Sequence, residues 1–361
     1  MARPTFARIF PEHIRHNARR VRELAPDSRI MACVKADAYG HDLGISSDAL
    51  ASCVDGFAVA CIEEALSLRS RHTSQPILML EGPQSSDEIG EAADKNITLC
   101  INEMHQLEWL EHSGIDTGLS CWVKIDTGMH RLGFNPQLVP EVLSRLAPRI
   151  NAPELVLCTH FSSADLPGEN GVREQLACFD DAVSQTEFAQ STANSAAIFR
   201  APASHRDWVR PGYMLYGGSP LAVATSADLK LKPAMEFSAE VISLRDVPQG
   251  ERVGYSGRWE AQRPSRIATI AAGYGDGYPR HAPDGTPVLI EGHRLPLAGR
   301  VSMDMITVDV TDHPAVQIGS RAVLWGSEPG VDEIAQHAGT IGYELLAGMP
   351  KRVPRIVSQV I

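Results

Sequence analysis

The sequence predicts an α/β protein of two parts, a (β/α)8 barrel followed by a mostly β C-terminal domain. Eight short apolar segments alternate with amphipathic helical segments between residues 29 and 217. Polar residues stand directly after several of these segments. After Lys232-Pro233 the pattern changes to strands separated by turns rich in Gly and Pro. We therefore expect a barrel over residues 1–230 and a β-rich domain over residues 231–361.

The eight candidate strands are runs rich in Val, Ile and Cys. They cover residues 29–36, 56–61, 76–82, 97–101, 119–126, 154–161, 190–196 and 207–217. Continuous apolar runs separated by helices indicate parallel strands that are covered on both faces. Eight such units match a TIM-type barrel in number and length. The seventh segment, QSTANSA, is the most polar of the eight.

The position of the polar residues distinguishes a closed barrel from an open doubly wound sheet. Lys35, the turn at 126–131, His160, Ser195 and Arg210 each follow an apolar run. Barrel enzymes place their chemistry at the carboxyl ends of many strands, whereas an open sheet concentrates it around one switch point. The pattern favours the barrel and predicts the active site at its carboxyl-end face.

The region from residue 231 onward is typical of antiparallel β structure. Segments such as MEFSAEVISLRDV and TPVLIEG alternate with Gly/Pro turns, and helical periodicity returns only at 332–339. We expect a sandwich or barrel, joined by the strand TFARIF near the start of the chain. The Gly-rich segment 271–280 lacks the spacing and the following helix of a dinucleotide fingerprint, so we interpret it as a turn.

The composition favours small-molecule chemistry. The formal net charge is -11 with both signs interspersed, which gives no electrostatic footprint for nucleic acid or an anionic membrane. The N-terminus lacks the apolar core of a secretory signal, and no run of about 18 apolar residues predicts a membrane span. We expect a cytoplasmic protein.

The seven cysteines are odd in number and have no C-x-x-C spacing. Buried, reduced thiols are the expected state. H-E-x-x-H and G-x-S-x-G are absent from the sequence, and the histidines have no ligand spacing. We therefore expect neither a metal site nor serine-hydrolase chemistry.

Lys35 is the first candidate for chemistry. It ends a buried strand and is followed one helical turn later by Tyr39 and then by Gly40. Burial lowers the pKa of a lysine, and a neutral amine condenses with an aldehyde. The alternative is a lysine with a buried stem whose ammonium group reaches solvent at the barrel mouth. This segment by itself leaves both interpretations open.

The ends of strands seven and eight suggest a phosphate site. The segments TANSAA (192–197) and VRPGYMLYG (209–217) lie where barrels commonly bind phosphate. Ser195 is alternatively a helix N-cap, and Arg210 is alternatively a surface ion-pair residue. Tyr255, flanked by glycines, is expected to be exposed, as many tyrosines without a function are.

Together these motifs resemble the bacterial alanine racemases in order and spacing, nearly from end to end. The matching segments are VKADAYGH, DTGMHRLGF, CTHF, ANSA, VRPGYMLYG, VGYSGRW, AAGYGDGYPR, SMDM and TIGYELL. The pattern looks especially like the subgroup that includes the catabolic enzymes. The resemblance implies a homodimer that interconverts L-alanine and D-alanine with pyridoxal 5'-phosphate, for D-alanine biosynthesis or for alanine breakdown.

The resemblance also implies which residues bind the cofactor. Lys35 matches the lysine that forms the Schiff base. The positions that match phosphate-binding residues are Tyr39, Ser195, Gly212, Tyr213 and Tyr343. Arg210 matches the arginine that faces the pyridine nitrogen, and His160 matches a histidine beneath or beside the ring.

A second base and the substrate contacts follow from the same resemblance. Racemisation needs two bases on opposite faces of the cofactor. Lys35 is expected to act on the D-enantiomer, and Tyr255 of the partner subunit on the L-enantiomer. Met303 also matches a residue that reaches the partner's site, and Asp304 lies beside it. Arg131 matches the arginine that holds the cofactor's phenolate oxygen and the substrate carboxylate.

A hydrogen-bonded chain from Tyr255 through His160 to Arg210 is a further hypothesis. An ordinary tyrosine is a poor base at neutral pH, so it needs surroundings that favour the phenolate. Lys124 matches a lysine that is often carbamylated in relatives, and a plain ion-pairing lysine is the alternative.

Two positions depart from the family pattern. Asp42 stands where most relatives have glycine, and Ser302 where many have cysteine. We expect both to affect loop conformation or packing rather than proton transfer.

The alternatives for function are a serine or broad-specificity amino-acid racemase, a basic amino-acid decarboxylase of the same fold type, and a non-catalytic protein that holds pyridoxal phosphate.

Overall fold

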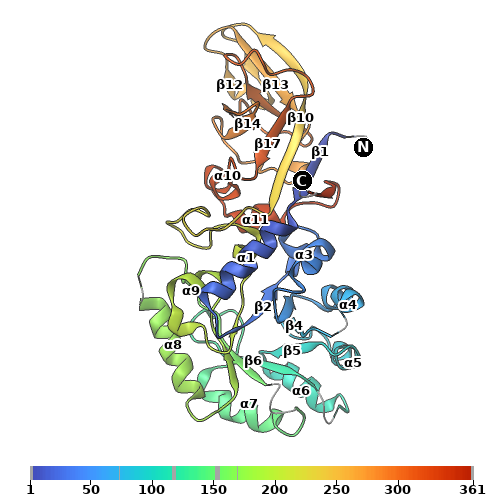
Figure 1. The fold of residues 1–361 in the computed structure, drawn as a ribbon, viewed down its shortest axis with the longest axis vertical. Helices are drawn as coiled ribbons and strands as arrows, with labels where there is room; N and C mark the ends of the chain where they lie inside the picture. The colour runs from blue at the N-terminus through green and yellow to red at the C-terminus, as the bar shows by residue number, and fades with distance from the viewer. Residues whose placement is uncertain (1–2, 73, 116–118, 151–154, 169, 359–361) are drawn as a thin grey trace.

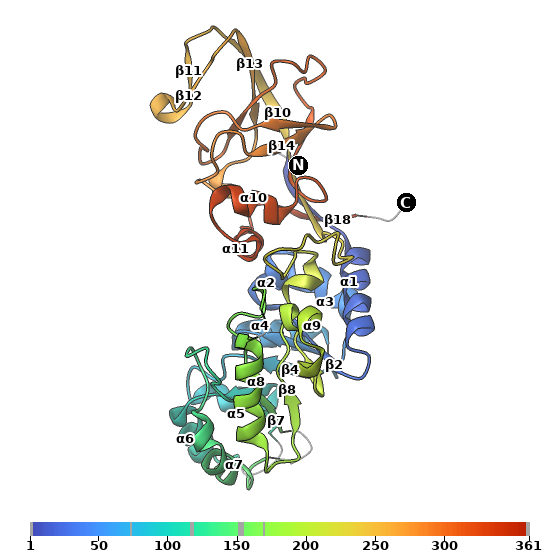
Figure 2. The same cartoon turned by 90° about the vertical axis from the view of Figure 1, so that its left-hand side faces the viewer.

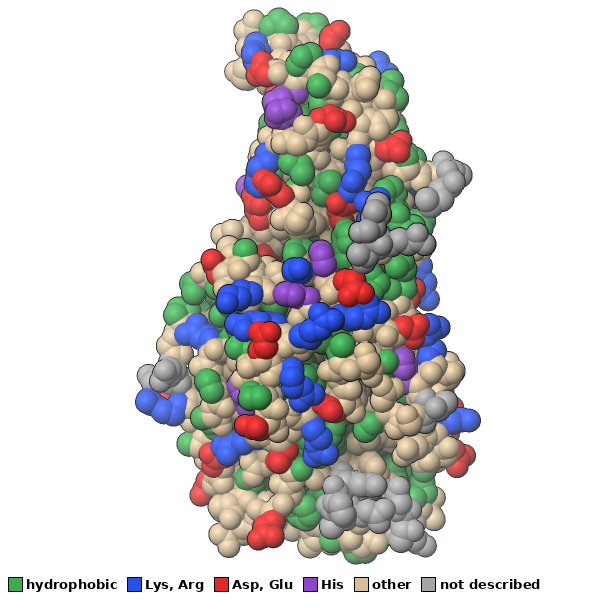
Figure 3. Space-filling view, viewed as in Figure 1, with side chains coloured by type: hydrophobic (Ala, Val, Ile, Leu, Met, Phe, Trp, Pro, Cys, Tyr) green, Lys and Arg blue, Asp and Glu red, His purple; other side chains and the backbone are tan. Residues whose placement is uncertain are grey.

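Two domains lie end to end in an elongated molecule (Figure 1). The computed structural model describes residues 3–72, 74–115, 119–150, 155–168 and 170–358. Acidic and basic side chains are interspersed over both domains on the face shown in Figure 3. Among the described residues, no helix has the length and apolarity needed to cross a bilayer.

The N-terminal domain contains the eight predicted strands in one parallel sheet. They are β2 (Arg29–Cys33), β3 (Gly56–Val59), β4 (Ile77–Met79), β5 (Thr98–Ile101), β6 (Cys121–Lys124), β7 (Val156–Cys158), β8 (Ala189–Ser191) and β9 (Trp208–Val209). The order is β8-β7-β6-β5-β4-β3-β2-β9. A parallel bridge between Asn194 and Arg210 brings the two end strands together. The barrel prediction is confirmed, including its polar seventh strand.

Helices follow the strands and surround the barrel (Figure 1). They are α1 (Pro11–Leu24), α3 (Leu43–Leu50), α4 (Ile62–Arg71), α5 (Asp87–Asp94), α6 (Met104–His112), α7 (Val139–Leu146), α8 (Asn170–Val183) and α9 (Ser195–Arg200). In α1 the buried residues Ile14, Ala18 and Val21 recur at helical spacing and so form one apolar face. The barrel interior has its own cluster, which includes Met31, Leu78, Trp122 and Trp208.

Each strand is shorter than its predicted segment. The residues left over at the carboxyl ends form the loops of the barrel mouth, so Lys35, His160 and Arg210 stand just beyond β2, β7 and β9. This is the face at which barrel enzymes carry their active sites.

The C-terminal domain is mostly antiparallel, as predicted. Its strands are β10 (Met235–Val247), β11 (Arg252–Val253), β12 (Trp259–Glu260), β13 (Ser265–Ile270), β14 (Pro287–Ile290), β15 (His293–Pro296), β16 (Ile306–Asp309), β17 (Arg321–Trp325) and β18 (Arg355–Val357). The long strand β10 pairs with β13, β17 and the N-terminal strand β1 (Thr5–Ile9). The prediction that TFARIF joins this domain is therefore confirmed.

Two helices of the C-terminal domain lie near the barrel (Figures 1 and 2). They are α10 (Val331–Ala338) and α11 (Gly342–Ala347). The sequence pattern predicts α10, but α11 is missed because six residues are too short to display helical periodicity.

The junction between the domains is fixed by Asn17 of α1. Its side chain is fully buried and donates to the carbonyl oxygen of Lys232 at 2.8 Å, while its own oxygen accepts from the Lys232 N–H at 2.8 Å. Gly217 has φ +83°, and a Cβ there would lie 2.1 Å from the Lys232 carbonyl oxygen. The chain therefore leaves the barrel in one defined direction.

Candidate active site

A cavity of about 1490 Å³ lies between the barrel mouth and the helices α10 and α11. It brings together most of the site residues that the sequence predicts. Those lining it are Lys35, Tyr39, Arg131, His160, Ser195, Arg210, Gly212, Tyr213 and Tyr343. They come from both domains and from five different loops, as expected for the carboxyl-end face of a barrel.

Lys35 opens a turn of left-handed helix, α2 (Lys35–Tyr39). Ala36, Asp37, Ala38 and Tyr39 all have φ between 51° and 55°. The sequence suggested an ordinary right-handed helical turn, and that prediction is wrong because the turn is left-handed. Left-handed helix costs roughly 1–2 kcal/mol per non-glycine residue, so the surrounding structure must impose it.

Two hydrogen bonds hold this turn. The Ala36 N–H donates to Glu64 at 2.7 Å, and the Asp37 carboxylate accepts from the Leu43 N–H at 2.9 Å. Asp42 then caps α3 by accepting from the Ile45 N–H at 2.9 Å, although its φ is +69°. The aspartate therefore adopts the positive φ that favours glycine, and its capping bond offsets part of the strain.

Ser195 is not the N-cap of α9. Asn194 takes that position, since its side-chain oxygen accepts from the Ala197 N–H at 3.0 Å. The buried Ser195 hydroxyl is thereby free to accept from the Gly212 N–H at 2.9 Å. A Cβ on Gly212 would lie 2.5 Å from the Tyr39 hydroxyl oxygen. The predicted phosphate-binding positions Ser195, Gly212 and Tyr39 thus converge, and there is no room for a side chain at position 212.

Arg210 is buried, which excludes the alternative of a surface ion-pair residue. Its guanidinium donates to the carbonyl and hydroxyl oxygens of Ser191 and to the carbonyl oxygen of Thr159. Among the described residues, no carboxylate lies within ion-pair distance of it. The positive charge of Arg210 is therefore available to a ligand in the cavity.

The floor of the cavity is strongly electropositive. Burial lowers the pKa of His160 well below its usual range, and the positive charges of Arg210, Lys124, Arg131 and Lys35 lower it further. His160 is consequently neutral at physiological pH. Four cations around one neutral imidazole suit an anionic ligand. Carbamylation of Lys124, at the end of β6, stays a prediction.

The turn before Arg131 is ordered by Asp126. One carboxylate oxygen accepts from the N–H groups of Gly128, Met129 and His130 at 3.0–3.1 Å. This arrangement fixes the chain that delivers Arg131 to the cavity.

Tyr255 and Met303 do not line the cavity of their own chain. Tyr255 is 65% exposed and lies between β11 and β12, at the end of the C-terminal domain far from the barrel (Figure 2). Met303 is 52% exposed. A single chain therefore does not unite Tyr255 with Lys35, and the chain from Tyr255 through His160 to Arg210 stays a prediction.

The loop that carries Met303 is anchored by a buried carboxylate. Asp276 is fully buried and accepts from Arg352 at 2.8 Å and from Arg3 at 2.5–2.8 Å. Arg352 also donates to Asp304 at 2.6 Å. Nearby, the Ser302 carbonyl oxygen accepts from the Tyr274 N–H at 3.0 Å. The last contact uses only the backbone at position 302, so it can form with serine or cysteine there.

Several cavity residues escaped the sequence analysis. Tyr216 stacks on Tyr39 with ring centroids 4.9 Å apart and donates its hydroxyl to the Cys33 carbonyl oxygen. His41 is buried against Tyr216. Asp332 accepts from the Tyr213 hydroxyl at 2.5 Å. Tyr216 and His41 lie within motifs that the sequence displays, whereas no local signal marks Asp332.

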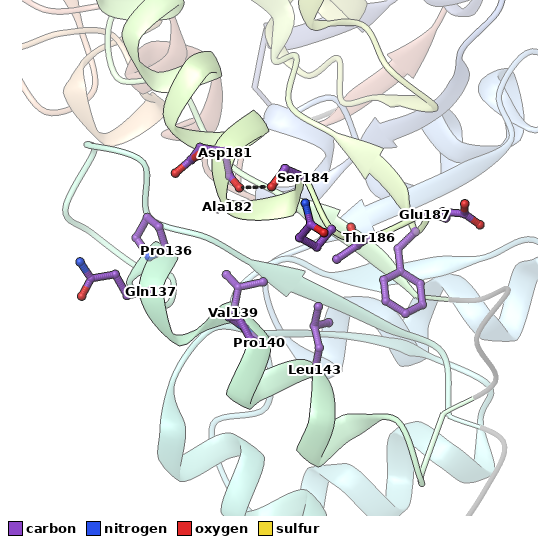
Figure 4. A pocket seen from close by; sticks show the side chains of 12 residues that line it. Pro136, Gln137, Val139, Pro140, Leu143, Asp181, Ala182, Ser184, Thr186 and Glu187 are labelled. Carbon is purple, nitrogen blue, oxygen red and sulfur yellow. Dashed lines mark hydrogen bonds between the residues drawn. The ribbon is translucent and has the colours of Figure 1, made fainter.

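Two further features bear on alternative functions. A pocket of about 830 Å³ lies outside the barrel, between α7 and the end of α8 (Figure 4). Its lining includes Val139, Leu143 and Phe188 but has no cationic side chain. In the described parts of the chain, no group of three or more His, Cys, Asp or Glu residues could hold a metal ion. The described geometry places the strongest candidate chemistry at the barrel mouth.

Comparisons with known proteins agree with this geometry. The family model "Alanine racemase, N-terminal domain" matches residues 9–220, and "Alanine racemase, C-terminal domain" matches residues 234–357. The biosynthetic alanine racemase of Pseudomonas aeruginosa is 46% identical over 98% of this chain and 99% of that protein. The catabolic alanine racemase of Pseudomonas putida is 42% identical over 98% of each.

The crystal structure of the Pseudomonas aeruginosa biosynthetic enzyme superposes with a TM-score of 0.96, covering 99% of this chain and all of that one at 46% identity. Both domains, their order and the barrel mouth between them are thus shared with known racemases. The chain belongs to the alanine racemase family.

Proposed function

We propose that the chain interconverts L-alanine and D-alanine, with pyridoxal 5'-phosphate bound at the barrel mouth. The observation that carries the proposal is the buried guanidinium of Arg210, which bonds only neutral oxygens in the same cavity as Lys35. The relatives named as alanine racemases supply the substrate.

The residues present fit this cofactor. An aldehyde needs an amine, and Lys35 lines the cavity. A phosphate dianion needs donors and positive surroundings. Ser195 and Gly212 meet beside Tyr39, and the cations Arg210, Lys124 and Arg131 near His160 supply positive charge. When bound, the cofactor withdraws electron density from the amino acid and so acidifies its α-proton.

Arg210 is proposed to face the pyridine nitrogen. A guanidinium is effectively always protonated, so it donates to that nitrogen and does not give it a proton. Electron withdrawal is then weaker than with an acidic partner, and side reactions are limited. Three hydrogen bonds hold the guanidinium of Arg210 in one orientation for this contact.

Two residues are proposed to move the α-proton. Lys35 accepts or returns it on the face of the D-enantiomer, and the partner subunit's Tyr255 does so on the face of the L-enantiomer. The exposure of Tyr255 and its absence from its own chain's cavity support a homodimer with shared sites. Arg131 is proposed to hold the substrate carboxylate, and the partner subunit's Met303 to reach the same site.

The test is to find which lysine carries the cofactor. Borohydride reduction of the purified protein, followed by peptide mapping, should place a pyridoxyl group on Lys35. The Lys35→Ala variant should take no label, whereas Lys124→Ala should still be labelled at Lys35. A colourless protein, or a label on Lys124, would refute the cofactor assignment. Racemisation rates with the enantiomers of alanine and of serine then test the substrate. A rate with serine as high as that with alanine would contradict a specific alanine racemase.

We further propose a cytoplasmic location. Cys100 and Cys158 form no disulfide, although their sulfurs lie 4.0 Å apart at hydrogen-bond distance. Reducing compartments keep thiols in this state. Recovery of the protein in the periplasmic fraction of cells would contradict the proposal.

A further inference from the structure

Tyr213 and Tyr343 stack across the boundary between the two domains. Tyr213 begins the 3-10 turn η4 (Tyr213–Tyr216) after the last barrel strand, and Tyr343 lies on α11 of the C-terminal domain. Their ring centroids are 3.8 Å apart and the ring planes are inclined by 15°. Tyr343 also approaches Tyr39, with ring centroids 6.3 Å apart. All three aromatic rings line the cavity.

A carboxylate holds the ring of Tyr213. The Tyr213 hydroxyl donates to one oxygen of Asp332 at 2.5 Å, and the Ser219 N–H donates to the other oxygen at 2.9 Å. Burial raises the pKa of Asp332, and these two bonds oppose the rise. No cation pairs with Asp332 in the described part of the chain. A largely buried carboxylate without a cation is costly, and its two acceptor bonds both go to the segment 213–219.

Two glycines make room for the ring of Tyr213. A Cβ on Gly342 would lie 1.8 Å from the Tyr213 hydroxyl oxygen and 2.6 Å from a carboxylate oxygen of Asp332. A Cβ on Gly218 would lie 2.1 Å from the ring of Tyr213. Neither glycine has a positive φ. Space for the Tyr213 ring, and not backbone freedom, is therefore what these two glycines provide.

We propose that Asp332 and Tyr213 are positioning residues for Tyr343. Asp332 fixes the phenol of Tyr213, the Tyr213 ring fixes the ring of Tyr343, and the Tyr343 hydroxyl is thereby presented to the cofactor phosphate. This inference rests on the proposed function, in which Tyr343 contacts that phosphate. The Tyr213 hydroxyl itself is occupied by Asp332, so any phosphate contact from residue 213 uses its backbone N–H.

The experiment is a double-mutant cycle read by cofactor affinity. The dissociation constant for pyridoxal 5'-phosphate is measured on the full chain by titration of visible absorbance. Tyr343→Phe should weaken binding about tenfold, the value of one hydrogen bond to a charged group. Tyr213→Phe keeps the stacked ring but releases Asp332, and it should weaken binding about threefold to tenfold. In the Tyr343→Phe background, Tyr213→Phe should cause no further loss.

Asp332→Asn is the second variant and Tyr278→Phe the control. An asparagine has one side-chain oxygen for two donors, so it should weaken binding as Tyr213→Phe does. Tyr278 is equally buried and stacks on Trp325, but its hydroxyl has no partner among the described residues. Tyr278→Phe should leave the dissociation constant unchanged.

The outcomes separate this inference from the proposed function. Equal losses from Tyr213→Phe in both backgrounds would show a structural role without action through Tyr343, and no loss from Tyr213→Phe or from Tyr343→Phe would also overturn the inference. If Tyr278→Phe weakened cofactor binding as much as Tyr213→Phe does, the effect would come from the loss of any buried hydroxyl and the inference would be wrong. Each of these results leaves labelling at Lys35 intact. A wild-type protein without cofactor on Lys35 would instead overturn the proposed function.

Discussion

The guanidinium of Arg210 donates two hydrogen bonds of 2.7 Å to Ser191, one to its carbonyl oxygen and one to its hydroxyl oxygen. Lysine cannot reproduce this planar arrangement of donors. We expect Arg210→Lys to lower kcat/KM for alanine more than tenfold, because the ammonium group leaves the neutral oxygens unpaired and shifts the charge. Steady-state racemisation, measured at equal cofactor occupancy, checks this.

Ser191→Ala and Arg206→Lys are the comparisons. Ser191→Ala removes one of the three bonds to Arg210 and should lower kcat/KM less than Arg210→Lys does, because the two bonds to carbonyl oxygens remain. Arg206 lies outside the cavity and pairs with Asp180, so Arg206→Lys should leave kcat/KM unchanged. Full activity in Arg210→Lys would show that only the charge at position 210 matters.

The proposed homodimer with shared active sites predicts complementation between two inactive variants. In a mixed dimer of Lys35→Ala and Tyr255→Phe subunits, one site loses both residues and the other keeps both. Random reassociation of equal amounts should restore about one quarter of the wild-type activity. Activity is measured before and after the subunits are mixed and dissociated together. A mixture as inactive as its components would mean that Tyr255 serves its own chain or no site at all.

The left-handed turn predicts that substitution by glycine raises the stability of the protein, although glycine within a helix usually lowers it. Ala36 is exposed and has φ 54°, a conformation in which glycine is unstrained. We expect Ala36→Gly to raise the free energy of unfolding by about 0.5–1 kcal/mol, the relief of left-handed strain less the chain entropy of glycine. Urea unfolding of the holoenzyme measures it.

Ala177 provides the matched control because it is exposed within the helix α8. Ala177→Gly should lower the free energy of unfolding by about 1 kcal/mol. The two substitutions must therefore differ in sign. A loss of stability in both variants would refute the assignment of strain to the turn at Ala36.

His41 predicts a loss of stability in acid. Burial lowers its pKa from 6.5 to about 4. Its Nδ1–H donates to the Tyr39 carbonyl oxygen, and its buried Nε2 has no partner among the described residues, so a second proton would be an unpaired donor. The unfolded chain takes up that proton first. The stability that neutral His41 contributes is therefore complete above pH 6.5 and is lost as the pH falls.

The comparison is with His41→Gln, which has no titrating group. Between pH 6.5 and 4, the unfolding free energy of the wild type should fall relative to the variant by about 1.4 kcal/mol per pH unit, to a total of about 3 kcal/mol. Between pH 7 and 8 the difference should be constant. A difference that stays constant down to pH 4 would show that His41 is not the responsible group.

Most of the fold could be predicted because its signals are local. Most barrel strands are short apolar runs, and several of them are followed closely by a polar residue. The more polar strand Ala189–Ser191 was predicted because a barrel needs eight such units. The hand of the turn at Ala36 could not be predicted. Alanine, aspartate and tyrosine show no preference that reverses a helix, and one contact that holds the turn comes from Glu64, 28 residues away.

The site was predicted as a set of positions but not as a set of contacts. The motifs identified Lys35, Ser195 and Arg210. Whether Ser195 caps a helix or binds a ligand could not be predicted, because the answer depends on Asn194 taking the N-cap position of α9. Asp332 lies 119 residues from Tyr213. A pairing of that kind leaves no periodicity or spacing in the sequence, and only the folded chain displays it.

The long strand β10 extends away from the junction that Asn17 fixes, so the direction of the chain at this junction determines where the far end of the strand lies. Thirteen residues of extended chain reach about 40 Å, from the junction to the end of the domain that carries Tyr255 (Figure 1). A small tilt at Lys232 is amplified along that length. The buried amide of Asn17 therefore sets the direction of the C-terminal domain. In the proposed homodimer, a disturbed junction at Asn17 would misplace Tyr255 in the partner subunit's site and so lower the activity of that site.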